Sequence, residues 1–365
     1  MTLTNPTQCG LPPWHTVGPL LDNADAATYA PAPLGLLEAR QAVADHLNGA
    51  VVPAHVVLTA STSEAYSWIF KLLCNAGDEV LVPAPSYPLF GFLAGLEGVV
   101  VRHYVSVYAG GEWQVDTAAL GEAVHSRVRA IVVVAPSNPT GSVLRMAELA
   151  AVEALCAHNG IALICNEVFA QTCGIYGAWP ADGVRSVAGR STCLTFALGG
   201  LSKACLLPQL KCAWIGMSGP AADLDSALAK LEIIADTYLS VGAPAQVALA
   251  QLLAMSTGVQ ANLHQRLTQN KNVLQIAIYD KPMTILPCFG GWSAVLRLPL
   301  GIDEELAALS LLDHAGVAVH PGNLYDFADH GHWVIILLPE PDAFAAGVAG
   351  LRQAALSWAT DDAHD

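Results

Sequence analysis

The sequence predicts an α/β protein, with a doubly wound, mostly parallel sheet in a large domain and a smaller α+β domain after it. Three observations lead to this fold class. Short, strongly apolar runs alternate with segments of helical periodicity, which is the pattern of βαβ units. These runs show little polar alternation, as expected for strands covered on both faces. The pattern changes near residue 258, where a long polar helical segment begins.

The first part of the chain contains the elements expected of the large domain. The helix predicted over residues 36–47 ends at Asn48-Gly49, a stop and turn signal, and the helix over residues 62–74 begins at hydroxyl side chains. A third helix is predicted over residues 146–160. The predicted strands occupy residues 55–60, 79–85, 98–107, 128–136, 161–169 and 191–200.

The rest of the chain predicts the smaller domain. Its expected elements are a long helix over roughly residues 258–280, a strand at 290–299, a helix at 303–316, a strand at 333–339 and a terminal helix at about 341–358. We therefore expect three parts. They are an arm over residues 1–28 that joins the small domain and covers the functional site, a large domain over residues 29–257, and a small domain over residues 258–365.

Composition excludes several classes of function. The chain is 53% hydrophobic, yet its most apolar runs are far shorter than the roughly 20 residues that span a bilayer. The N-terminal residues lack both a basic and an apolar signal region, so we expect no signal peptide. The formal net charge of −15 disfavours nucleic acid and anionic membrane surfaces as partners, but it is compatible with a small anion at one cationic site.

Cysteine and histidine usage indicates a cytoplasmic protein without a metal centre. The nine cysteines include no CxxC pair, which favours buried free thiols in a reducing compartment over disulfides or a zinc site. The twelve histidines include no HExxH spacing. His330 and His332 flank a single glycine, but this is a weak ligand pattern, and we expect no metal ion.

Two lysines lie in an otherwise uncharged segment. Residues 198–216 contain Lys203 and Lys211 and read as buried. A lysine without a nearby carboxylate is costly to desolvate, so these positions need an explanation. Extension of the ammonium group to the surface is one explanation, and taken alone it is the better one. A functional amine is the other.

Polar side chains follow four of the predicted strands, at the sheet edge where doubly wound proteins bind ligands. They are Ser61, Thr62 and Ser63; the segment SNPTG at 137–141; Asn166; and Ser202 with Lys203. The first group can be read as a helix cap and the second as a turn. A helix start with free N–H groups is also a phosphate site, with Lys211 as a source of positive charge.

Four short motifs then define a resemblance. APSYPLF at 84–90, APSNPTG at 135–141, NEVF at 166–169 and GLSK at 200–203 have the order and approximate spacing found in class I/II aminotransferases. Those proteins are fold type I enzymes that use pyridoxal phosphate. Residues 29–43 also resemble the N-terminal motif of that family. The likeness covers nearly the whole chain, and the set of motifs is specific although each motif alone is weak.

The resemblance implies a role for Lys203. Its amine would form a Schiff base with the aldehyde of pyridoxal 5′-phosphate and later move a proton between the substrate Cα and the cofactor. This chemistry requires an amine that is neutral at working pH, and apolar surroundings favour the neutral form. The resemblance therefore makes Lys203 a nucleophile.

The resemblance also implies which residues hold the phosphate of the cofactor. Thr62 and Ser63, in the helix start that contains Ser61, match the phosphate cup, and Ser202 matches a hydroxyl close to the reactive lysine. Lys211 stands where the family usually has an arginine. A lysine keeps the positive charge but lacks the planar, bidentate fork.

Further residues would contact the cofactor ring. Tyr87 would stack on the pyridine, and Asn138 would hydrogen-bond the ring hydroxyl. Asn166 stands where the family has an aspartate that keeps the ring nitrogen protonated, so we expect slow transamination or a reaction that needs a weaker electron sink. Phe169 replaces a tyrosine of many members. Tyr29 resembles a tyrosine that reaches the phosphate of a neighbouring subunit, which implies a homodimer with shared sites.

The substrate site is less well predicted. Many members hold the substrate carboxylate with an arginine on a strand near the C-terminus, and the segment 333–338 has none. Arg297 is the nearest cation by pattern, although it can also be an exposed strand residue. Asn5 and Gly10, in the segment NPTQCG, are candidates for closing over the substrate.

The expected function is therefore that of a cytoplasmic, homodimeric, pyridoxal-phosphate-dependent aminotransferase. It would move an amino group from an amino acid to a 2-oxo acid or another carbonyl. One alternative is a lyase, decarboxylase or cyclising enzyme on the same fold, and another is a catalytically impaired binder of the cofactor. Asn166 favours both alternatives, whereas the presence of Lys203 argues against the impaired binder.

Overall fold

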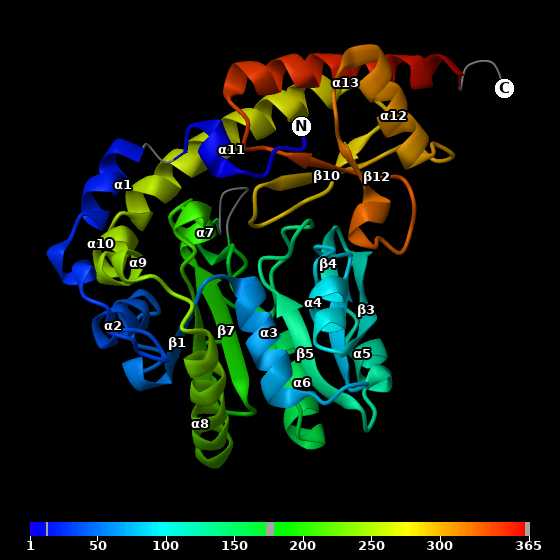
Figure 1. Cartoon of the computed structure of the whole chain (residues 1–365). Helices are drawn as coiled ribbons and strands as arrows, with labels where there is room; N and C mark the ends of the chain where they lie inside the picture. The colour runs from blue at the N-terminus through cyan, green and yellow to red at the C-terminus, as the bar shows by residue number, and fades with distance from the viewer. Residues whose placement is uncertain (12–13, 173–178, 362–365) are drawn as a thin grey trace.

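The structure is a computed structural model that describes residues 1–11, 14–172 and 179–361. It contains an eight-stranded sheet flanked by helices and a second, four-stranded sheet that lies above it in Figure 1. The N-terminal segment lies against the second sheet, since the Ile336 N–H donates to the Met1 carbonyl and the Met1 ammonium group donates to the Ala318 carbonyl.

The large sheet is mixed but mostly parallel. Its strand order is β1-β8-β7-β6-β5-β2-β3-β4. The five central strands β7, β6, β5, β2 and β3 pair in parallel, while β8 and β1 at one edge and β4 at the other pair antiparallel. The strands are β1 (Val56–Thr59), β2 (Glu79–Ala84), β3 (Val100–Ala109), β4 (Glu112–Val115), β5 (Val128–Val134), β6 (Ala162–Asn166), β7 (Thr195–Gly200) and β8 (Ala213–Ser218).

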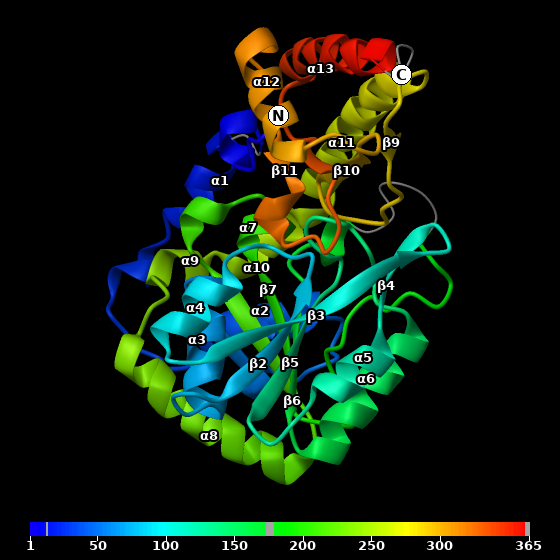
Figure 2. The same ribbon diagram turned by 90° about the vertical axis from the view of Figure 1, so that its right-hand side faces the viewer.

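Helices cover both faces of this sheet (Figure 2). Val80 and Val82 of β2 pack in one apolar cluster with α3, α4 and α8, whereas Leu81 packs in another with α5 and α6. Successive strand residues point to opposite faces, so one continuous apolar run supplies both layers. The helices are α2 (Leu37–His46), α3 (Thr62–Leu73), α4 (Phe90–Leu96), α5 (Thr117–Ala123), α6 (Met146–Asn159), α7 (Leu201–Ala204), α8 (Ala221–Tyr238), α9 (Ala243–Val247) and α10 (Leu249–Ala254).

The second sheet is antiparallel and has its own apolar core. Its order is β11-β12-β10-β9, and helices α11 and α13 pack on it together with α12. Trp333 is fully buried at the centre of this core. The elements are α11 (Ser256–Ile278), β9 (Thr284–Ile285), β10 (Ser293–Arg297), α12 (Glu304–Ala315), β11 (His320–Pro321), β12 (His332–Ile336) and α13 (Pro341–Asp361), after an N-terminal α1 (Trp14–Leu21).

The elements expected from periodicity are confirmed with shifts of a few residues at their ends. The expected strand over 161–169 is shorter, because it ends at Asn166 and a short 3-10 turn, Ala170–Thr172, follows. The sequence reading did not predict β4, β8 or α8. The expected division between residues 257 and 258 falls inside the first turn of α11 and stays a prediction. Within the described residues, no helix combines the length and apolar character that crossing a bilayer requires.

Candidate active site

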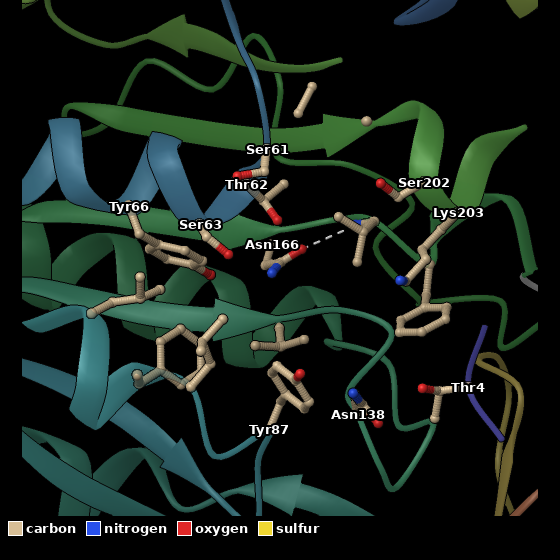
Figure 3. A pocket seen from close by; sticks show the side chains of 18 of the residues that line it. Thr4, Ser61, Thr62, Ser63, Tyr66, Tyr87, Asn138, Asn166, Ser202 and Lys203 are labelled. Atoms are coloured by element: carbon tan, nitrogen blue, oxygen red, sulfur yellow. Dashed lines mark hydrogen bonds between the residues drawn. The ribbon is translucent and has the colours of Figure 1, made fainter. Parts of the chain in front are cut away.

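A cavity of ≈ 270 Å³ lies between the two sheets, at the carboxyl ends of β5, β6 and β7 and at the start of α3 (Figure 3). The second sheet and its connections contribute Trp292, Tyr325 and Ile336, and the N-terminal segment contributes Thr4. Nine of the residues singled out in the sequence line this one cavity. They are Ser61, Thr62, Ser63, Tyr87, Asn138, Asn166, Phe169, Ser202 and Lys203.

Lys203 lies in α7, which begins directly after β7. Burial lowers the pKa of its ammonium group from 10.5 to about 8. In the described part of the chain no carboxylate pairs with it; its Nζ lies instead 4.9 Å from the centre of the Trp292 ring. The ring face offers a weak attraction to the cation, but it does not replace lost hydration. The amine is therefore held closer to its neutral form than an exposed lysine would be.

The start of α3 presents hydrogen-bond donors to the cavity. Ser61 is the N-cap, and its hydroxyl accepts from the Glu64 N–H at 3.2 Å, while the Glu64 carboxylate accepts from the Ala60 N–H at 2.6 Å. These two hydrogen bonds define where the helix begins. Thr62 and Ser63 follow, with their hydroxyls directed toward the cavity in Figure 3. Backbone N–H groups and the helix dipole at this end favour a bound anion.

The Asn166 side chain is oriented by the backbone that follows it. Its Oδ1 accepts a hydrogen bond from the Val168 N–H at 3.2 Å, so the amide NH2 group faces the other way (Figure 3). The next residue, Glu167, points to the opposite face of the sheet. There its carboxylate accepts from the Val187 N–H at 2.6 Å and from the Ser186 hydroxyl at 2.7 Å. Because successive residues of an extended segment point to opposite faces, the Asn166 amide faces the cavity and the Glu167 carboxylate does not.

Two loops lock the cavity walls together. The N–H groups of Phe289 and Gly290 both donate to the Gly141 carbonyl, at 2.9 and 3.2 Å. Gly141 has a φ of +65°, and a Cβ there would lie 2.4 Å from the Gly290 oxygen. Only glycine fits this contact without strain. The contact holds the turn that carries Asn138 against the segment that leads to Trp292.

Aromatic side chains form the remaining walls. Phe169 and Trp292 pack edge to face with ring centres 5.0 Å apart, one from the end of β6 and the other from the loop before β10. Tyr87 lines the opposite wall and is 51% exposed. Tyr325 also faces the cavity, and its hydroxyl bonds to His320 Nδ1 at 2.9 Å.

Lys211 and Tyr29 lie away from this cavity. Lys211 is exposed at the end of a short 3-10 turn. Its position agrees with the explanation that its ammonium group extends to the surface. Tyr29 is 80% exposed and lines a separate hollow with residues 239–243. Within the described residues of one chain, neither residue therefore reaches the cavity in which the resemblance places its role.

The substrate residues suggested by the sequence also lie outside the cavity. The Arg297 guanidinium stacks on the Tyr108 ring at 4.8 Å and lines a different, polar hollow. Asn5 caps a short 3-10 turn by accepting from the Thr7 N–H at 3.1 Å. Gly10 ends that turn with a φ of +71°. Thr4, directly before Asn5, is the residue of this segment that lines the cavity.

Sequence reasoning missed Thr4, Tyr66, Trp292 and Tyr325. A signal was available for Tyr66, because it lies one helical turn after Thr62 and Ser63 and therefore shares their face. Nothing in the local sequence places Trp292 or Tyr325 beside Lys203, since their positions depend on how the second sheet packs on the first.

Comparisons with known proteins agree with this geometry. A family model described as aminotransferase class I and II matches residues 14–334. The chain is similar to an alanine aminotransferase of Mycobacterium tuberculosis, with 27% identity over 338 residues, 89% of this chain and 77% of that one. It is also similar to the glutamate-pyruvate aminotransferase AlaA of Escherichia coli, with 25% identity over 321 residues, 84% of this chain and 78% of that one.

Solved structures share the fold. The structure of an alanine aminotransferase from Pyrococcus furiosus superposes with a TM-score of 0.87 and covers 97% of this chain and 91% of that one. The two sequences are only 20% identical, so this likeness concerns the fold. The mixed eight-stranded sheet and its helices agree with the α/β class expected from the sequence.

Proposed function

This chain belongs to the aminotransferase class I and II family, and from that membership we propose that Lys203 is its reacting amine and the surrounding cavity its cofactor site. Members of the family use pyridoxal 5′-phosphate to transfer amino groups, and the chain is an enzyme of this kind. The observation that carries the proposal is a largely desolvated lysine that has no carboxylate partner among the described residues and lines the same cavity as a capped helix start. The relatives named alanine and glutamate-pyruvate aminotransferases do not favour the alternative of a lyase or decarboxylase.

The residues of the cavity fit this cofactor. The start of α3 offers N–H groups and the hydroxyls of Thr62 and Ser63, which suit a phosphate dianion. The buried Tyr66 hydroxyl makes no hydrogen bond of ordinary geometry within the described residues, as expected where a polar group of a ligand belongs. Lys203 supplies the amine at the other end. Phosphate donors, ring contacts and the amine are therefore all present.

The bound cofactor supplies an aldehyde that condenses with amines and a ring that accepts electrons. The rest of the chemistry falls to the chain. Burial gives Lys203 a substantial neutral fraction near pH 8, so its Nζ can attack a carbonyl and afterwards carry a proton to or from a substrate carbon. The centre of the Trp292 ring lies 4.9 Å from this amine, and Phe169 packs edge to face against that ring.

Further roles follow from position. We propose that Asn138 donates to the ring hydroxyl, that Tyr87 stacks on the ring, and that Ser202 adds a hydroxyl to the phosphate site, since all three line the same cavity. Phe169 offers an apolar contact only. Lys211 is exposed in the single chain, so a contribution to the phosphate would require its side chain to turn inward.

We propose that the enzyme works as a homodimer with shared sites. Tyr29 is 80% exposed, and other large apolar side chains are exposed as well, among them Phe92 at 72% and Leu96 at 84%. Exposed apolar groups of this size favour burial against a partner, and a second copy would give Tyr29 a phosphate to reach. A monomeric mass in light scattering would contradict the dimer. The free thiols of the described cysteines support a cytoplasmic location.

The substrate is proposed to be an amino acid that gives its amino group to a 2-oxo acid or another carbonyl. Lys203 is the one basic side chain among the described residues that line the cavity, and Arg297 is not one of them. A substrate carboxylate would therefore depend on neutral donors such as Thr4 and Asn138, or on the second subunit. Neutral donors bind a carboxylate more weakly than an arginine does.

The test combines absorbance with covalent trapping. The purified protein with pyridoxal phosphate should show a visible band that amino donors, alanine and glutamate included, discharge and that a 2-oxo acid restores. Borohydride reduction followed by peptide mass analysis should place the cofactor on Lys203, and Lys203→Ala should abolish the label. A label on another lysine, or a band that no donor discharges, would contradict the proposal.

A further inference from the structure

The end of the cavity away from Lys203 contains two side chains that can donate hydrogen bonds and, among the described residues that line it, no acid. They are Tyr66 of α3 and Asn166 of β6, which we call the donor pair (Figure 3). We propose that the donor pair binds the ring nitrogen of the cofactor as a hydrogen-bond acceptor, with the Asn166 N–H and the Tyr66 O–H sharing its single lone pair, so that this nitrogen stays unprotonated in the resting enzyme. The inference rests on the proposed function, because it presumes that the cofactor occupies this cavity.

The orientation of Asn166 is the first argument. Its Oδ1 is taken up by the Val168 N–H, so the group left for the cavity is the NH2 donor. An amide in this orientation can donate to a lone pair, but it cannot accept the proton of a pyridinium. A protonated ring nitrogen would therefore meet a donor with its own N–H, and one of the two would lose its hydrogen bond.

The Tyr66 hydroxyl is the second argument. Its oxygen is buried beside the Asn166 amide, yet it makes no hydrogen bond of ordinary geometry in the described part of the chain. Burial raises the pKa of Tyr66, an effect larger than the opposing influence of Asn166, so the phenol keeps its proton. A buried O–H group without an acceptor needs one, and a neutral pyridine nitrogen would provide it.

The shape of the cofactor links these donors to that atom. In pyridoxal phosphate the ring nitrogen is para to the carbon that bears the aldehyde. With the aldehyde at Lys203, the nitrogen would face away from α7 and toward the wall that Tyr66 and Asn166 form. A phosphate group bound at the start of α3 would keep the ring from turning over.

No described acid is placed to protonate the nitrogen. The Glu64 carboxylate is bound by the Ala60 N–H and the Ser240 hydroxyl, and that of Glu167 lies on the far face of the sheet. Burial holds the pKa of the Cys165 thiol well above its usual value, so Cys165 offers no thiolate. Lys203 and Tyr87 also line the cavity, and neither side chain is a carboxylic acid.

The test measures the protonation state of the ring nitrogen directly. Holoenzyme loaded with pyridoxal phosphate that is ¹⁵N-labelled in the ring should give, near pH 7, the ¹⁵N shift of a hydrogen-bonded neutral pyridine. Asn166→Asp adds a carboxylate at the same place and should move the signal to that of a pyridinium. It should also speed removal of the Cα proton from an amino donor. A pyridinium signal in the unaltered enzyme would overturn the inference.

Tyr66→Phe tests the second member of the pair. It should move the ¹⁵N signal toward that of a free pyridine and weaken pyridoxal phosphate binding by roughly 3- to 10-fold, the loss of one hydrogen bond. Tyr104→Phe is the matched control. Tyr104 is equally buried, but its hydroxyl donates to the Val132 carbonyl outside the cavity, so its loss should change neither readout. Identical results for the two variants would remove Tyr66 from the proposal.

Failure of the inference can be told apart from failure of the proposed function. If borohydride places the cofactor on Lys203 while the nitrogen is protonated, the proposed function stands and the donor-pair inference is wrong. If the cofactor is not found on Lys203, both fail.

Discussion

Lys203 owes its chemistry to what surrounds it. It is packed in α7 near the Trp292 ring, and in the described residues no carboxylate balances its charge. In such surroundings the charged form loses hydration that nothing restores, so the balance moves toward the neutral amine. The same residue type at Lys211 is exposed, although both lysines lie in the same uncharged segment of the sequence.

We expect capture of pyridoxal phosphate by the cofactor-free chain to speed up with pH around a midpoint near 8. Only the neutral amine attacks an aldehyde, and burial lowers the pKa of Lys203 from 10.5 to about 8, so the neutral fraction grows as pH rises through that value. Stopped-flow absorbance from about pH 6.5 to pH 10 measures the rate. A midpoint near 10.5 would mean that the amine is hydrated and the argument from burial is wrong.

At the scale of single elements, α3 both completes the fold and forms the anion site. The Ser61 hydroxyl caps the helix, whereas the Ser63 hydroxyl points into the cavity two residues later. The two serines look equivalent in the sequence. Their difference comes from the geometry of a helix start, where the N-cap side chain folds back onto the first turn.

Alanine at these two positions should therefore affect two different properties, stability and cofactor binding. Ser61→Ala should lower the free energy of unfolding by about 1 kcal/mol, the usual cost of a lost N-cap. Ser63→Ala should change it by less than about 0.5 kcal/mol while weakening pyridoxal phosphate binding. Urea unfolding and cofactor titration measure the two quantities. Equal losses of stability in both variants would argue against the separation of roles.

The last residue of β6 and the residue directly after it face two different surfaces. Asn166 faces the cavity, and Glu167 is buried on the opposite face, where burial raises the pKa of its carboxyl group to about 7. The two hydrogen bonds that Glu167 accepts, from Val187 and Ser186, only partly offset the lost hydration. The strand therefore carries an ionisable group whose burial makes stability depend on pH.

Glu167→Gln should reduce that dependence. In the unfolded chain the carboxyl group loses its proton near pH 4.5, but in the folded chain it does so only near 7, so the unfolded state binds fewer protons between these values. The free energy of unfolding should then fall as pH rises through this window, by at most about 3 kcal/mol. Glutamine can accept from the Val187 N–H through its oxygen and donate to the Ser186 hydroxyl oxygen through its NH2 group, without the charge. Urea unfolding at several pH values tests this, and an unchanged slope would contradict it.

At the scale of the whole molecule, the site exists because two sheets meet. The large sheet provides Lys203 and Asn166, and the second sheet with its loops provides Trp292 and Tyr325. The contact of Gly141 with Gly290 is one of the places where the two parts lock together. A substitution at that contact should therefore lower both the free energy of unfolding and the affinity for the cofactor.

Gly141→Ala should cost about 2–4 kcal/mol of unfolding free energy and weaken cofactor binding. Alanine is strained at a φ of +65°, and its Cβ would also lie 2.4 Å from the Gly290 oxygen. Gly110→Ala is the control, with a φ of +61° and open space around the Cβ, so it should cost only about 1 kcal/mol and leave binding intact. Similar results for both would show that the sheet contact is unimportant.

Much of the molecule follows from the sequence by itself, for a local reason. Hydrophobic periodicity acts over a few residues, so α2, α3, β2, β5 and α11 appear close to where it predicts them. Polar residues directly after buried strands must lie at one sheet edge, and this brought Ser63, Asn166 and Lys203 to one cavity.

The tertiary structure alone decided the rest. Thr4, Trp292 and Tyr325 reach Lys203 only because the N-terminal segment and the second sheet pack across the first, a contact between residues far apart in the chain. The same packing left Arg297 on the Tyr108 ring and Tyr66 buried beside Asn166. The arrangement of all the elements decides which polar groups are buried and which of them are hydrogen-bonded. No local pattern of residues contains this information.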